Sequence, residues 1–186
     1  MAMDLRELLR TQCTNVLARE RDIAKINLQM VDEVTNPRLK SMFSDRTSPI
    51  DKEISNLETV VDQLGGETKP QNAGFLLKVE ELFGVGINEA AELSVKTMMA
   101  AHRAFVDAKP PQYVIDAHDA LEEERLVHLN IADYTGLIVL AKQLGENDIA
   151  ALLQWNIDSE SSLRTKLEME LPQVLADLSN QGKMAA

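Results

Sequence analysis

Residues 13–34 read CTNVLARERDIAKINLQMVDEV, and the spacing within this stretch decides the fold. Steps of three and four residues alternate along the series Cys13, Val16, Glu20, Ile23, Asn27, Met30 and Val34. This alternation places the side chains in one stripe and is typical of the inward-facing seam of a helix in a bundle. It predicts a first helix from about Asp4 to Val34.

The rest of the chain repeats this helical pattern between turn signals. Thr35-Asn36-Pro37 ends the first helix and begins a second, which stops at Gly65-Gly66. Further helices are predicted over about 75–108, 111–144 and 147–177, with Asn147 as a cap and Pro172 as a kink. We therefore predict one all-α domain over residues 1–186, a four-helix bundle with one additional helical segment. Its parts are a hairpin at about 4–65, a linker and bridging segment at about 66–109, and a hairpin at about 111–177.

Composition excludes several classes of protein. The 186 residues are 45% hydrophobic with 8 Gly and 6 Pro, as in a globular domain. No apolar run reaches the roughly 20 residues of a membrane span, and the first residues do not resemble a signal peptide. The single cysteine, Cys13, excludes an intramolecular disulfide, fits a cytoplasmic location and is expected to pack as a buried small side chain. A net charge of −11 predicts neither a nucleic-acid nor a membrane partner.

Polar residues interrupt the seams near the middle of the helices. They are Glu20 and Asn27 in the first helix, Glu124 and His128 in the fourth, and Asn156 and Glu160 in the fifth. A buried carboxylate is costly unless it is paired or binds a metal. Two interpretations stay open: an iron or manganese site between helices, as in di-iron bundles, or a hydrogen-bonded polar layer, for example Glu124 with His128.

Several motifs resemble those of the YciE/YciF-type ferritin-like proteins over residues 10 to 170. They are the turn TNPRL at 35–39, ISNLETVVDQLG at 54–65, DYTGLIVLAKQLG at 133–145 and IAALL at 149–153. The resemblance implies a ferritin-like bundle associated with bacterial stress responses and without an established activity.

The resemblance also implies that most of the family's metal ligands are missing. The glutamate of the first helix matches Glu20, but the Glu-x-x-His of the second helix falls on SPID at 48–51. In the fourth helix a Glu-His-Tyr-Glu run reads VHLN at 127–130, and the acidic stretch of the fifth helix thins to DSESS at 158–162. We therefore expect a degenerate site with no cofactor. Under the alternative, iron or manganese would be held by ligands from the set Glu20, Asp51, Glu124, His128, Asp158 and Glu160.

The motif Ser48-Pro49-Ile50-Asp51 has the form of a helix start, with serine at the N-cap and proline at the first position. It predicts that the second helix is kinked or restarts there, and that Asp51 is a capping residue. His102 and His118 are expected to be surface or packing histidines.

We expect a non-catalytic stress-associated or interaction protein, although its being an enzyme stays open. A homodimer is expected through an apolar segment whose members are Phe75, Leu76, Leu77, Val79, Leu82, Phe83, Val85 and Ile87. One alternative is a di-iron or manganese oxidase or peroxide-handling protein. Another is a binding module for a small apolar ligand.

Overall fold

The computed structural model describes residues 4–68, 97 and 100–185, and it is helical throughout these ranges apart from turns. Four long helices are present: α1 (Leu5–Glu33), α2 (Pro37–Gln63), α5 (Gln112–Gln143) and α6 (Asn147–Ala185). Residues 100–107, here called the bridge helix, are also helical. No strand occurs among the described residues. The predicted all-α fold is confirmed, whereas the apolar segment 75–87 lies outside the described residues.

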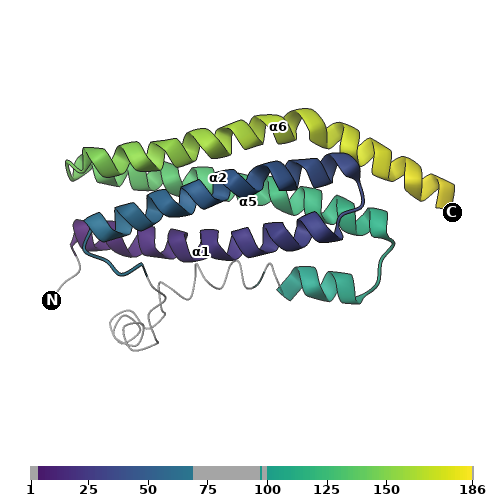
Figure 1. Cartoon of the computed structure of the whole chain (residues 1–186), viewed down its shortest axis with the longest axis horizontal. Coiled ribbons are helices and arrows are strands. Elements are labelled where there is room, and N and C mark those ends of the chain that lie inside the picture. Colours follow the sequence, from purple (N-terminus) through teal and green to yellow (C-terminus); the bar gives the residue numbers. More distant parts are fainter. Residues whose placement is uncertain (1–3, 69–96, 98–99, 186) are drawn as a thin grey trace.

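The helices form a bundle of two hairpins (Figure 1). α1 packs chiefly on α2 and α5 on α6, while α2 also faces α6 and α1 faces α5. α2 ends at one end of the bundle and α5 begins at the other, so α2 and α5 run in the same direction. A four-helix bundle with one such long crossover has the ferritin-like topology. None of the described helices is long and apolar enough to cross a lipid bilayer.

Local chemistry sets the helix ends. The side chain of Asn36 caps α2 by accepting hydrogen bonds from the N–H groups of Arg38 (3.0 Å) and Leu39 (3.1 Å). α2 and α5 each end before a glycine with positive φ, Gly65 (74°) and Gly145 (75°). Glycine adopts this left-handed conformation without the steric penalty of a Cβ, and it therefore suits the position after a helix.

A buried carboxylate joins the two hairpins. Asp116 on α5 accepts hydrogen bonds from the N–H (3.1 Å) and hydroxyl (2.8 Å) of Thr35 and from the N–H of Asn36 (2.8 Å). Asp116 has no exposed surface. The turn between α1 and α2 is thus held by a side chain of the second hairpin.

The core has two large apolar clusters, one towards each end of the bundle. One cluster contains Leu9, Leu17, Leu57 and Leu153, and the other contains Phe43 with residues near the opposite ends of α1 and α6. The predicted seam of α1 is buried at all seven positions, including Glu20 and Asn27. The rest of the core consists of two smaller apolar clusters, around Ile23 and around Leu167, and a set of buried polar side chains.

Three sequence-based expectations about the helices are wrong. The inward face of α5 is displaced by about one residue, so Glu123 is buried while Glu124 is partly exposed and His128 exposed. Of the two alternatives for the second helix, a restart at Ser48 is wrong, because α2 is continuous through Pro49, whereas a kink there stays a prediction. α6 runs past Pro172 to Ala185 instead of ending near residue 177, and its C-terminal part bends away from the line of the rest (Figure 1).

The interior position of Pro49 predicts a stability change. Proline offers no N–H to the carbonyl of Asp45 and its ring crowds that carbonyl, so Pro49→Ala should raise the free energy of unfolding by about 1–3 kcal/mol. Ser48 is exposed and caps nothing, so Ser48→Ala should change it by less than about 0.5 kcal/mol. Urea unfolding of both variants measures this. If Ser48→Ala instead lowers the free energy of unfolding by about 1 kcal/mol, the usual cost of removing an N-cap, then the second helix does restart at Ser48.

Candidate functional site

The middle of the bundle holds a layer of buried charged and amide side chains from all four long helices, here called the central layer. None of its members is more than 6% exposed. They are Arg19 and Glu20 from α1, Arg46, Glu53 and Asn56 from α2, Glu123, Asn130 and Tyr134 from α5, and Asn156 and Glu160 from α6.

Arg46 contacts acids from two other helices. Its Nη1 lies 2.6 Å from Oε1 of Glu123, and its Nη2 donates to Oε1 of Glu160 at 3.1 Å. Asn130 donates from Nδ2 to the same oxygen of Glu160 at 2.7 Å. Burial alone would lower the pKa of Arg46, but the charges of Glu123 and Glu160 raise it above its usual value. Arg46 is therefore a permanent buried cation.

Three carboxyl groups meet beside this cation. One oxygen from each of Glu20, Glu53 and Glu160 lies within 4.8 Å of the other two. Tyr134 donates its hydroxyl to Oε1 of Glu20 at 3.1 Å. The Oε2 atoms of all three glutamates are buried and have no hydrogen-bond partner among the described residues. Unpartnered buried oxygens of this kind call for a proton or a cation.

Amide groups close the edge of the central layer. Asn56 donates to Oδ1 of Asn156 at 2.8 Å, and Asn156 donates to the backbone carbonyl of Glu53 at 3.2 Å. On the other side, Arg19 donates to Oδ1 of Asn130 at 3.0 Å and also pairs with Asp133. These contacts join α2 to α6 and α1 to α5. Each fixes the orientation of the side chains that form it.

Burial raises the pKa of three of these acids above the ordinary value of a glutamate. The loss of solvation, followed by the charges of Glu160 and Glu20, raises the pKa of Glu53 to about 9. Burial and the charge of Glu160 raise the pKa of Glu20 to about 7. Burial also raises the pKa of Glu123, against the lowering effect of Arg46. The central layer therefore combines a fixed positive charge on Arg46 with carboxyl groups whose pKa is raised.

The sequence-predicted candidates divide into two groups. Glu20 and Glu160 come together in the central layer. Asp51 lies inside the continuous helix α2, so the prediction that it is a capping residue is wrong. Both Asp51 and Asp158, the latter on α6, are exposed. Glu124 and His128 form a pair with 3.0 Å between Oε1 and Nε2 at the outside of α5, which is the pairing that the polar-layer interpretation gave for them, although not in the core.

Sequence reasoning missed Arg46, Glu53 and Glu123 and did not treat Asn130 as a core residue. The available signal was position: Arg46 follows Phe43 by three residues and Glu53 follows Ile50 by three, and both steps continue the buried stripe of α2. The resemblance had placed the ligand motif of this helix on residues 48–51, whereas the buried glutamate is Glu53.

The residues present do not fit a two-metal centre. Carboxylate-bridged di-iron bundles use a glutamate from each of two helices and a Glu-x-x-His from each of the other two. Here α2 and α6 contribute Glu53 and Glu160, but the residues three positions later are Asn56 and Leu163. α1 supplies Glu20, while α5 places Asn130 against Glu160. With both imidazoles and one carboxylate missing and Arg46 against Glu160, the donor set suits at most one hard cation.

The raised pKa of Glu53 predicts a pH-dependent effect of Glu53→Gln. Between the ordinary value of 4.5 and about 9, the folded chain keeps a proton that the unfolded chain releases, so this group makes stability fall as pH rises. Glutamine mimics the protonated acid and removes the effect. Relative to wild type, Glu53→Gln should gain at least about 2 kcal/mol between about pH 5 and about pH 8 in urea unfolding. Asp51→Asn, on the exposed face of the same helix, is the control, and equal pH profiles for Glu53→Gln and wild type would contradict the protonated state.

Comparison with known proteins places the fold in a family. The solved structures with this fold include YcfI from Rhodopseudomonas palustris, with 22% identity, a TM-score of 0.72 and coverage of 89% of this chain and 93% of that one. The E. coli stress protein YciF has 16% identity, a TM-score of 0.73 and coverage of 96% and 99%. A protein from Xanthomonas campestris has 15% identity, a TM-score of 0.71 and coverage of 97% and 99%.

At these identities the structures show the fold alone. No curated protein matches the chain. Residues 4–179 match the family model described as "Domain of unknown function (DUF892)", and the chain therefore belongs to the DUF892 family.

Proposed function

We propose that this chain is a non-catalytic, stress-associated member of its family, in which a buried ion-paired layer stands where a ferritin-like bundle would hold two metal ions. The observation that carries the proposal is Arg46, which contacts Glu123 and Glu160 at 2.6 and 3.1 Å inside the bundle. A guanidinium does not lose its proton in proteins and does not exchange with solvent ions. It supplies the positive charge that bound metal would otherwise bring.

The ligand set supports the same proposal. Redox chemistry at a di-iron or di-manganese centre needs imidazole and carboxylate ligands from four helices, and Asn56, Asn130 and Leu163 offer neither group. The similarity in fold to the E. coli stress protein YciF supports a stress-associated role. A cytoplasmic location and the absence of nucleic-acid partners remain predictions from composition and from the charge of −11.

One specific observation favours the metal-binding alternative. Glu20, Glu53 and Glu160 each leave one buried oxygen without a partner among the described residues, and these three side chains would hold a single divalent ion if one were bound. Carboxylate oxygens suit Mn²⁺ or Mg²⁺. The oxidase interpretation would require that the ion be redox-active, as iron or manganese is, whereas Mg²⁺ would supply Lewis acidity alone.

The small apolar ligand receives less support. A cavity of about 230 Å³ lies beside α1, α5 and the bridge helix. Four of its ten lining residues are apolar: Ile26, Met30, Val106 and Leu126. The other six are polar or charged, although apolar atoms make up most of the lining surface, so the cavity suits a ligand with both apolar and polar groups.

Metal analysis distinguishes the two leading functions. Protein purified without chelator from cells grown with iron and manganese should retain well under one of these ions per chain after dialysis, because too few ligands converge. Elemental analysis of wild type, Glu53→Gln and the exposed control Asp51→Asn provides the measurement. Near-stoichiometric iron or manganese that is lost only in Glu53→Gln would establish the oxidase-type site and reject the non-catalytic proposal.

A variant of Arg46 sharpens the same experiment. If its charge replaces that of a metal, Arg46→Ala leaves buried acids in need of a cation. Mn²⁺ should then raise the melting temperature of Arg46→Ala more than that of wild type. If Arg46→Ala does not fold, the metal content of wild type still distinguishes the non-catalytic proposal from the metal-binding alternative.

We also propose that the chain forms a homodimer through residues 75–87, on the strength of their dense apolar sequence. Light scattering at micromolar concentration should give the mass of a dimer, and Phe83→Glu should reduce it to that of a monomer. Leu28→Glu, at a 55% exposed position of α1, is the matched control. A monomeric wild type contradicts the dimer, and a dimer that survives Phe83→Glu rejects this segment as its interface.

A further inference from the structure

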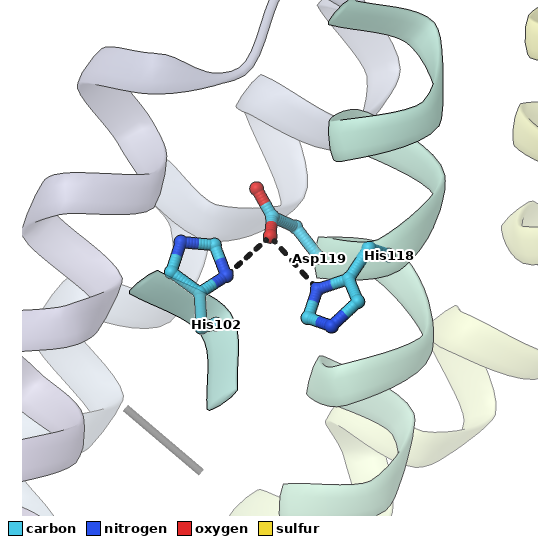
Figure 2. A group of neighbouring side chains, drawn as sticks. All are labelled: His102, His118 and Asp119. Atoms are coloured by element: carbon cyan, nitrogen blue, oxygen red, sulfur yellow. Dashed lines mark ion pairs between the residues drawn. The ribbon is translucent and has the colours of Figure 1, made fainter. Parts of the chain in front are cut away.

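A second group of metal-ligating side chains lies outside the central layer, where the bridge helix meets α5. His102 comes from the bridge helix, and His118 and Asp119 are consecutive residues of α5. Figure 2 shows both imidazole rings directed at the same carboxylate. The Nδ1 atoms of His102 and His118 lie 3.3 and 3.5 Å from Oδ1 of Asp119.

Hydrogen bonding does not account for this arrangement, and an ion pair with Asp119 would require a protonated histidine. Asp119 has no exposed surface, and neither of its oxygens has a hydrogen-bond partner among the described residues. The Nδ1 atoms of both histidines are also buried and without such a partner. Buried polar groups are satisfied in most proteins, so four unpartnered ligand atoms that face one another require an explanation.

The separations match those between ligands of one tetrahedral ion. Zinc–nitrogen and zinc–oxygen bonds of about 2.0–2.1 Å place neighbouring ligand atoms about 3.4 Å apart. The two nitrogen–oxygen distances lie on either side of this value. The ligand atoms of the three residues all lie within 4.8 Å of one another.

Each of the two rings has a further neighbouring side chain. Phe105 stacks on His118 with 4.4 Å between the ring centroids and 17° between the planes. The Nε2 of His102 lies 3.9 Å from a carboxylate oxygen of Glu33 on α1. At this distance Glu33 does not hydrogen-bond His102, but its charge lies on the side of the ring where metal-bound histidine commonly has a carboxylate.

We propose that His102, His118 and Asp119 bind one divalent transition-metal ion of the Zn²⁺ class, with a fourth position left for water. Two imidazoles and one carboxylate are a donor set that zinc accepts in sites with three protein ligands. His102 also lines the cavity of about 230 Å³, which gives solvent a route to the site. The bound ion would fasten the bridge helix to α5, and with it the connection between the two hairpins.

The chain provides its own control for this proposal. It contains three histidines, and the third, His128, is exposed on α5 and paired with Glu124. Full-length protein freed of metal by chelator and dialysis is titrated with Zn²⁺ by calorimetry, and the imidazole resonances are followed by NMR. We expect saturation at one ion per chain, with shifts at His102 and His118 and none at His128.

Substitutions then identify the ligands. Each of His102→Gln, His118→Gln and Asp119→Asn should weaken Zn²⁺ binding by more than about 100-fold, which is the upper end of the effect of losing a supporting residue. His128→Gln should leave the affinity unchanged. Circular dichroism checks the fold of each variant, and the NMR shifts of wild type decide wherever a variant is unfolded.

The contrary outcomes are equally specific. The absence of saturable Zn²⁺ binding by wild type overturns the proposal. So does binding that persists in His102→Gln and His118→Gln, or binding that only Glu53→Gln abolishes, since the ion would then lie in the central layer.

Discussion

A guanidinium group buried between carboxylates of two other helices is the constraint on which the middle of this bundle depends. Removing Arg46, Glu123 and Glu160 from water carries a large desolvation cost, and only close pairing offsets it. α2, α5 and α6 must therefore keep the register that brings these groups together. A shift of any one helix by a turn would leave a charge buried and alone.

The apolar clusters and the central layer have different physical roles. The clusters near the two ends of the bundle supply the non-directional hydrophobic term. Leucine and valine seams tolerate several alignments, however, and do not distinguish strongly between them. Directional contacts such as Asn56 with Asn156 and Tyr134 with Glu20 are satisfied in one alignment. Burying these acids lowers the stability of the folded state. In return, their directional contacts favour one alignment of the four long helices over the others.

The sequence predicts the fold well because long helices display their buried stripe as a period. The seam of α1 is correct throughout, and Asn156 and Glu160 of α6 are inward as predicted. The period fails on α5, where three consecutive glutamates offer two phases and where Leu121 is apolar but 51% exposed. Hydrophobic periodicity assumes that leucine faces inward and glutamate outward. Leu121 and Glu123 do the reverse, so the pattern favours the wrong face of α5.

The polar contents of the site are harder to read for a related reason. Periodicity identifies which positions face inward but not which charges meet. Arg46 contacts Glu160, which follows it by 114 positions, only after the hairpins pack. His102 and Asp119 likewise come from separate helices whose contact no local pattern encodes. The adjacent pair His118 and Asp119 is visible in the sequence, but its partner is not. Turn and capping residues act locally, and the helix boundaries predicted at Asn36, Gly65 and Gly145 are confirmed, whereas the cap predicted at Ser48 does not form.

Asp116 has a consequence for how the chain reaches this structure. The backbone N–H groups of Thr35 and Asn36 find their acceptor 80 or more residues later, so the first hairpin cannot satisfy its own turn while it is alone. Closing so long a loop has an entropic cost that must be met before the contact forms. The first hairpin should thus be only marginally ordered until α5 docks, and the two hairpins are expected to fold as one cooperative unit instead of as independent halves.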